Sequence, residues 1–217
     1  MNTNALAAEF IGTFALIFIG AGAGSISGSL VAVALAHGLV VLAFAYNYGP
    51  VSGTHINPAV TVGLLAGGQI GVGPAAGYIA AQFAGGVAGA ATLSFVLAGK
   101  APALGATVPA DGVGTAQAFL LELILTFFLV NSIYFSAVSG KAGNLAPVSI
   151  GLTLTFCILM GGPLTGASLN PARSLGPALF SSAPTALSSL WIYFVACPLG
   201  GVLAALVYKG IGAGEEG

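Results

Sequence analysis

Residues 52–60 read Ser-Gly-Thr-His-Ile-Asn-Pro-Ala-Val, and residues 165–173 read Thr-Gly-Ala-Ser-Leu-Asn-Pro-Ala-Arg. The two stretches share a Gly and an Asn-Pro-Ala in one register, and Asn170 follows Asn57 by 113 positions. One Asn-Pro-Ala alone indicates only a helix start, with Asn as the N-cap and Pro in the first helical position. Two copies in matching context indicate a relation between the halves of the chain.

The spacing of 113 recurs elsewhere. Glu9 and Glu122 each begin a Glu-x-x-x-Thr-Phe motif, and Gly38 pairs with Gly151 at the same distance. Three features at one spacing predict an internal duplication. We expect a single domain over residues 1–217, with repeats at about 1–100 and 115–210 joined by a Pro- and Gly-containing loop at 101–114.

The composition predicts a membrane protein. Of the 217 residues, 57% are hydrophobic and 4% are charged, with a mean hydropathy of +1.04. Soluble domains carry about 25% charged residues, so most of this surface is expected to face the lipid bilayer. The net charge of −1 and the lack of a basic patch argue against nucleic acid as a partner.

Enzymatic chemistry has no candidate residues here. There is no nucleophile–base pair, phosphate-binding loop or metal-ligand cluster. Cys157 and Cys197 lie in apolar runs and read as small buried side chains. We therefore expect no enzyme, no cofactor and no metal.

Six apolar runs are long enough to span a bilayer, which takes about 20 residues. They cover about 5–28, 30–48, 75–98, 115–138, 145–162 and 188–209. Two shorter runs, 57–67 and 170–180, each begin at an Asn-Pro-Ala and predict half-helices that enter the membrane and stop. The backbone before them, 50–56 and 162–169, is expected to be irregular and therefore buried or facing a cavity. The predicted fold class is an all-α membrane protein with six transmembrane helices and two re-entrant half-helices.

Because each repeat has three spans, the second repeat starts on the opposite side of the bilayer from the first, so the repeats should be inverted copies. The two half-helix N-termini then meet near the midplane. Lys141 and Lys209 would lie on one side, with Lys100 and Asp111 on the other, which favours cytoplasmic termini.

Glycines indicate close helix packing in the first span. Gly20, Gly24 and Gly28 recur at four-residue spacing. Such stripes of small residues let helix backbones approach each other in membranes.

Where the two half-helices meet, we expect a filter that passes neutral solutes and excludes cations. Each N-terminus carries about half a positive charge, so a cation between them is repelled. Asn57 and Asn170 offer amide donors to a passing molecule, and Pro58 and Pro171, followed by Ala59 and Ala172, set the first helical turns. Oriented donors in an apolar pore interrupt a proton wire, so protons are excluded as well.

Arg173 is the only Arg and follows the second Asn-Pro-Ala, where the first repeat has Val60. One interpretation is a residue that extends to the membrane interface. The other is a fixed charge and donor at a pore constriction, because the half-helix start places it at depth.

The intramembrane carboxylate pair and one of the two histidines each allow two interpretations. Glu9 and Glu122 either relay protons or accept hydrogen bonds from the irregular backbone before each half-helix. His37 lies 20 positions before Asn57 on the second span and is either a packed side chain or a pore-lining group. His55, whose counterpart is Ser168, is interpreted as bracing its loop.

At these residues the chain resembles the aquaporin (major intrinsic protein) family over nearly its whole length. The resemblance rests on the two Asn-Pro-Ala boxes, the repeated Glu-x-x-x-Thr-Phe, and the residues around each box. It implies a homotetramer with one pore per subunit, passive flow of water or small neutral solutes, and cytoplasmic termini. The absence of long tails fits a multi-pass protein of a prokaryotic inner membrane.

The family narrows its pore at four positions, which here correspond to His37, Ile158, Ala167 and Arg173. Strict water channels usually have an aromatic residue at the first position and His at the second. The set found here is similar to that of plant tonoplast intrinsic proteins, which pass water and often ammonia, urea or hydrogen peroxide. Ser174 occupies the place where glycerol facilitators have Asp. Loop 101–114 contains no His and is expected to add no filter group.

The resulting hypothesis is a passive channel for water that also admits ammonia or another small neutral solute. An alternative is an ion- or proton-coupled transporter using Glu9 and Glu122. A third is a structural membrane protein that conducts nothing.

Overall fold

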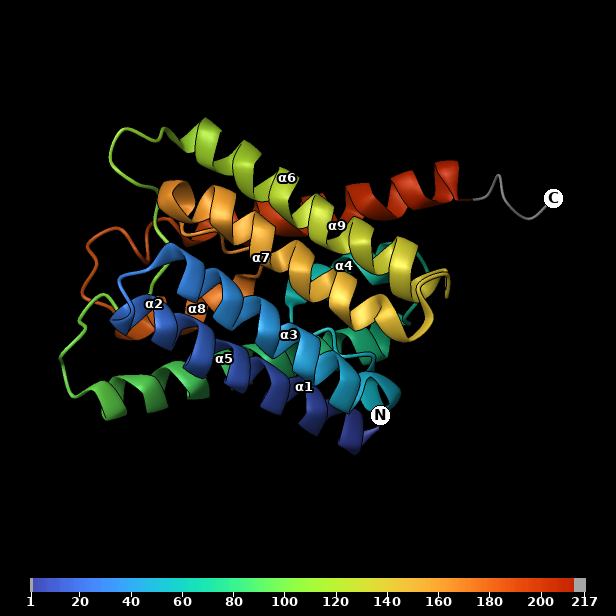
Figure 1. Cartoon of the computed structure of the whole chain (residues 1–217), viewed down its shortest axis with the longest axis horizontal. Coiled ribbons are helices and arrows are strands. Elements are labelled where there is room, and N and C mark those ends of the chain that lie inside the picture. Colours follow the sequence, from blue (N-terminus) through green and yellow to red (C-terminus); the bar gives the residue numbers. More distant parts are fainter. Residues whose placement is uncertain (1, 213–217) are drawn as a thin grey trace.

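The chain forms a bundle of helices in the computed structural model, which describes residues 2–212 (Figure 1). The first repeat contains α1 (Thr3–Ala15), η1 (Leu16–Ala21), α2 (Gly22–Ile26), α3 (Leu30–Ser52), α4 (Pro58–Ala66) and α5 (Val72–Leu97). The second contains α6 (Thr115–Ile133), η2 (Tyr134–Val138), η3 (Gly143–Leu145), α7 (Ala146–Thr165), α8 (Pro171–Phe180) and α9 (Leu190–Ile211). Residues 2–212 contain no strand.

Six helical segments are long and apolar enough to cross a membrane. They are Thr3–Ile26, Leu30–Ser52, Val72–Leu97, Thr115–Val138, Gly143–Thr165 and Leu190–Ile211. The predicted all-α membrane fold is confirmed. Leu, Ile, Phe and Val side chains are exposed along these spans, as expected of surfaces that face lipid or another subunit.

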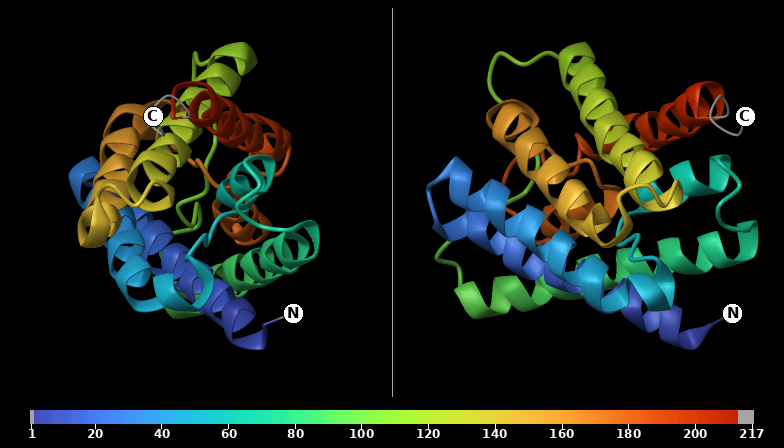
Figure 2. Two further views of the ribbon diagram at one scale, coloured as in Figure 1. Left: turned by 90° about the vertical axis from the view of Figure 1, so that its right-hand side faces the viewer. Right: turned by 45° about the vertical axis from the view of Figure 1, so that its right-hand side comes forward.

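The half-helices α4 and α8 have 9 and 10 residues. At 1.5 Å per residue, each extends about 15 Å, half of a 30 Å hydrocarbon core. They lie toward opposite ends of the long axis, whereas the start of α1 and the end of α9 lie at the same end (Figures 1 and 2). The repeats are therefore inverted, as predicted.

The helices that precede the half-helices are longer than the sequence indicated. α3 continues through Pro50 to Ser52, and α7 continues through Pro163 to Thr165. Each proline lies in the last turn, where its missing N–H removes one hydrogen bond without interrupting the earlier turns. The non-helical backbone is confined to 53–57 and 166–170.

α3 and α7 cross between the two repeats at a pair of glycines. A Cβ on Gly38 would lie 2.5 Å from the Gly151 carbonyl oxygen, and one on Gly151 would lie 2.7 Å from the Gly38 carbonyl oxygen. The contact is reciprocal, as expected at a pseudo-twofold axis. Only residues without a side chain allow this close approach.

Candidate pore between the two half-helices

Asn57 and Asn170 cap the N-termini of α4 and α8. The side-chain oxygen of Asn57 accepts a hydrogen bond from the Ala59 N–H at 2.8 Å. The side-chain oxygen of Asn170 accepts from the Ala172 N–H at 3.0 Å and the Arg173 N–H at 3.3 Å. Pro58 and Pro171 follow directly in the first helical position, where no N–H is needed.

The amide groups of the same two asparagines join the half-helices to each other. Asn57 Nδ2 donates to the Leu169 carbonyl at 2.8 Å, and Asn170 Nδ2 donates to the Ile56 carbonyl at 3.0 Å. An amide NH2 has two hydrogens. Each asparagine thus keeps one amide N–H for a molecule in the pore, and both side-chain amides are fixed in orientation.

Glu9 and Glu122 hold the backbone before each half-helix. Glu9 accepts from the Ser52 hydroxyl at 2.7 Å and from the N–H groups of His55 at 2.9 Å and Ile56 at 2.6 Å. Glu122 accepts from the corresponding groups, 113 positions later: Thr165 at 2.6 Å, Ser168 at 2.9 Å and Leu169 at 2.9 Å. Both carboxylates are fully buried, and neither lines the cavity described below.

This use of the N–H groups turns the backbone carbonyls away from the buried glutamates. In a trans peptide the N–H and C=O point in opposite directions. Because the N–H groups of His55 and Ile56 point at Glu9, the carbonyls of Thr54 and His55 point away from it. The non-glycine residues Thr54, Ile56, Ala167 and Leu169 have φ between 42° and 53° to achieve this. Such left-handed backbone costs about 1–3 kcal/mol per residue and is typical of functional sites.

The third span of each repeat completes the support, with a different spacing. The Tyr78 hydroxyl donates to the Ser52 carbonyl at 3.0 Å, and the Tyr193 hydroxyl donates to the Thr165 carbonyl at 2.8 Å. Gln82 contacts Glu9 at 2.7 Å and Cys197 contacts Glu122 at 3.6 Å. Both pairs are 115 positions apart, so the second repeat has gained two residues before its last span. A search at the spacing of 113 misses all four residues.

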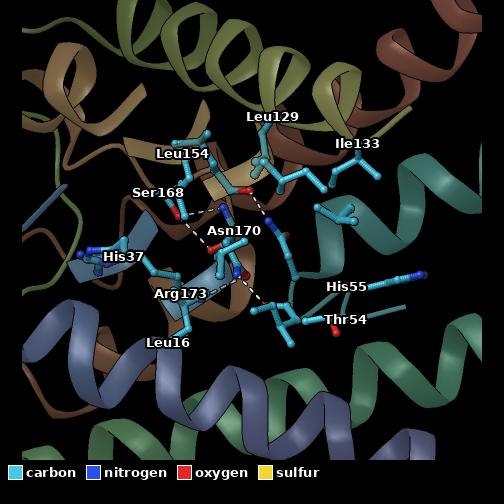
Figure 3. Close-up of a pocket in the computed structure, with 16 residues that line it drawn as sticks. Leu16, His37, Thr54, His55, Leu129, Ile133, Leu154, Ser168, Asn170 and Arg173 are labelled. Carbon is cyan, nitrogen blue, oxygen red and sulfur yellow. Dashed lines mark hydrogen bonds between the residues drawn. The ribbon is translucent and has the colours of Figure 1, made fainter. Parts of the chain in front are cut away.

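A cavity passes the two asparagines and is lined by residues of both repeats. Figure 3 shows His37 at one end of it and His55 at the other, with Asn170 between them. Asn57, Asn170, His37, His55 and Arg173 all line it. Leu, Ile and Val side chains form much of the remaining wall. A row of polar groups along an otherwise apolar wall holds a passing molecule in one orientation.

His37 lies on α3 and is 3% exposed. Its Nδ1 lies 2.9 Å from the Val33 carbonyl oxygen, which can only accept, so Nδ1 carries a hydrogen. In the neutral ring Nε2 is then an acceptor, and it is buried without a partner among the described residues.

Arg173 is buried on the first turn of α8. Its Nη1 donates to the Gly105 carbonyl at 2.6 Å, and its Nε has no partner within residues 2–212. Gly105 has φ +60°, and a Cβ there would lie 2.5 Å from the Ala21 carbonyl oxygen, so only glycine fits. The loop was expected to add no filter group, and Gly105 does not line the cavity. The loop does supply the backbone carbonyl that holds Arg173, and a carbonyl has no signature in the sequence.

The same loop is tied to α8 by hydroxyl groups. Thr107 Oγ1 lies 2.6 Å from Ser174 Oγ, which lies 2.6 Å from Ser168 Oγ. In the first repeat, the places of Ser168 and Ser174 are taken by His55 and Thr61, which are 3.1 Å apart. His55 thus braces its loop and also lines the cavity.

Ile158 and Ala167 are buried, at 2% and 1% exposure, but do not line the cavity. Ile158 Cγ2 lies 3.7 Å from the Cβ position of Gly162, and Ala167 Cβ lies 3.3 Å from that of Gly161. Both residues belong to the hydrophobic core. Their place in a constriction stays a prediction.

The geometry suits a neutral molecule. Two helix N-termini face one space, and each contributes a partial positive charge. The guanidinium of Arg173 adds a full charge, held by a neutral carbonyl group. A cation meets repulsion from three sources, whereas a molecule with a lone pair and a hydrogen finds donors and acceptors along one wall.

Comparison with known proteins agrees with this arrangement. The chain is 42% identical to "Glycerol uptake facilitator protein-like 6" of Lactiplantibacillus plantarum, covering 95% of this chain and 97% of that one. It is 38% identical to "Probable aquaporin TIP-type" of Medicago truncatula, covering 93% and 84%. The solved structure of the aquaglyceroporin from Plasmodium falciparum superposes with a TM-score of 0.89 at 26% identity, covering 97% of both chains.

The family model described as Major intrinsic protein matches residues 1–208, nearly the whole chain. That match includes both Asn-Pro-Ala boxes, both buried glutamates and the crossing glycines. The chain belongs to the Major intrinsic protein family.

Proposed function

We propose that this protein conducts water and ammonia passively, in single file, past Asn57 and Asn170. The observation that carries the proposal is the pair of facing N-caps, each with one amide N–H left for a solute. As a member of a channel family, the protein catalyses no reaction. The coupled-transport alternative has no support in the structure, because Glu9 and Glu122 are enclosed by their own loops.

Passage of ammonia is proposed from the groups around Arg173. The unpaired Nε–H of Arg173 is a donor that a lone pair can satisfy. Ile158 and Ala167, as further members of the ring, would offer only apolar contact. Ammonia has one lone pair and is weakly solvated compared with urea or glycerol, so a ring with one donor and apolar sides suits it. Ser174, buried against Thr107, is occupied by hydroxyl contacts.

The test is stopped-flow measurement on proteoliposomes. An impermeant osmolyte reports water flow, and an ammonium gradient with an internal pH dye reports ammonia entry. We expect both fluxes to exceed those of empty liposomes and to be indifferent to proton or sodium gradients. Water flow without ammonia entry would restrict the proposal to water. Flux that follows an ion gradient would contradict it.

Replacing His37 by Phe should separate the two solutes. Phe is larger than His and offers no ring nitrogen, so the opening beside Arg173 narrows. We expect ammonia entry to fall about tenfold, equivalent to about 1.4 kcal/mol of added barrier, and water flow to fall less. His37→Ala serves as the matched control, since it widens the same place. Unchanged fluxes in both variants would make His37 a packing residue.

We further propose that the protein forms a homotetramer in the inner membrane of the cell, with both termini of each subunit in the cytoplasm. Lys141 follows a span that ends on the side of the termini, and Lys209 lies in the last turn of α9 on the same side. Lys100 and Asp111 lie in the loop on the other side, in keeping with the positive-inside rule. In intact cells, an impermeant maleimide should label Lys100→Cys and leave Lys141→Cys unlabelled. Light scattering of the detergent-purified protein gives the number of subunits.

A further inference from the structure

The constriction residue His37 lies directly against Gly20 of the first span. A Cβ placed on Gly20 would lie 2.6 Å from Nε2, 2.6 Å from Cδ2 and 2.8 Å from Cε1 of the His37 ring. Real Cβ contacts to a ring are about 3.5 Å or longer. The imidazole therefore occupies space that exists only because residue 20 has no side chain.

The ring is fixed from its other side as well. Nδ1 is bonded to the Val33 carbonyl of the preceding helical turn at 2.9 Å. The side chain is 3% exposed, and it lines the cavity together with Arg173. Nδ1 is thus held by α3, the opposite edge of the ring lies against η1, and the ring also borders the cavity.

The second repeat provides an internal comparison. At a spacing of 113, Gly20 corresponds to Ile133 and His37 to Ile150, and both isoleucines line the cavity. One half of the chain thus has two branched side chains at these positions, and the other has a ring and a glycine. Gly20 itself lies in the π-helical segment Leu16–Ala21, a feature frequent at functional sites.

We propose that Gly20 is a specificity-determining residue of the channel, because it lets the His37 ring withdraw from the pore. A methyl group there would displace the ring by about 1 Å, the difference between 2.6 Å and an ordinary contact. The constriction beside Arg173 becomes narrower by that amount. Gly20 touches no solute and acts through His37. The inference deepens the proposed function by assigning what sets the solute size.

The test is a double-mutant cycle of Gly20→Ala and His37→Ala in the same liposome assays. Gly20→Ala alone should lower ammonia entry about fivefold or more and water flow less. In the His37→Ala background, the added methyl group has no ring to displace, so Gly20→Ala should change either flux by less than about twofold. Gly22→Ala, whose Cβ would meet only the end of Leu93 at 3.3 Å, is the control on the same span.

Thermal unfolding in detergent of the wild type, the two single variants and the double variant measures the contact between Gly20 and His37 independently of transport. If Gly20→Ala is destabilised or fails to fold, adding His37→Ala should restore the stability of the double variant. A Gly20→Ala protein with wild-type fluxes and stability would overturn the inference, as would losses that persist unchanged in the His37→Ala background. A wild-type protein that conducts nothing contradicts the proposed function alone, because the unfolding cycle still decides whether Gly20 positions His37.

Discussion

Replacing Glu122 by Ala should unfold the loop before α8 and abolish conduction. The carboxylate accepts from the Thr165 hydroxyl at 2.6 Å and from the N–H groups of Ser168 and Leu169 at 2.9 Å each, all in a fully buried place. Each buried donor left without a partner costs about 1–3 kcal/mol. Three of them cost about 3–9 kcal/mol, a large part of the 5–15 kcal/mol that stabilises a typical protein.

Thermal unfolding in detergent measures the effect. A loss of this size should lower the midpoint of thermal unfolding by about 6 °C or more, at 2–4 °C per kcal/mol for a chain of this length. Asp111→Ala is the matched control, because that carboxylate lies in an exposed loop, and its removal should change the midpoint by no more than about 1 °C. An unchanged midpoint for Glu122→Ala would remove the bracing role.

Glu122→Gln distinguishes bracing from proton relay. The amide keeps one acceptor oxygen, enough for the Thr165 and Ser168 contacts, and presents its NH2 to the Leu169 N–H. We expect a smaller loss of stability and, in the folded protein, water flow per channel close to wild type. A relay would instead lose transport in this variant while keeping its stability.

The duplication made most of the fold predictable. Because Asn57 and Asn170, or Glu9 and Glu122, recur at one spacing, the sequence places two short helices head to head with a carboxylate behind each. Helix length and apolar content supply the six spans. The C-terminal ends of α3 and α7 were less predictable, because Pro50 and Pro163 lie in the last turns of these helices, where proline is tolerated.

The parts of the site that escaped prediction share a physical reason. The group that holds Arg173 is a backbone carbonyl of Gly105, and every residue has one. Gly20 counted as a helix-packing glycine, and only the structure shows that a ring fills its space. Tyr78 and Tyr193 match at 115 positions, so a fixed register hides them. Contacts made by backbone or by the absence of a side chain leave no motif.

Replacing Arg173 by Ala should open the pore to cations and to larger neutral solutes. A charge that passes about 5 Å from the guanidinium meets about 3 kcal/mol of repulsion at an effective dielectric constant of 20. Removing it should raise proton or ammonium-ion leakage about 100-fold, since 1.4 kcal/mol is a factor of ten. The two half-helix N-termini remain, so leakage should stay far below that of an ion channel.

The measurement is proton flux into liposomes with an internal pH dye, driven by a potassium diffusion potential, together with urea flux by light scattering. Arg173→Lys is the matched control: it keeps the charge but loses the planar fork whose Nη1 bonds to Gly105. We expect Lys to preserve cation exclusion while altering urea flux, and Ala to lose both forms of selectivity. If Arg173→Ala is as tight to protons as wild type, the half-helix dipoles alone exclude cations, and Arg173 serves only to hold loop 101–114 against α8.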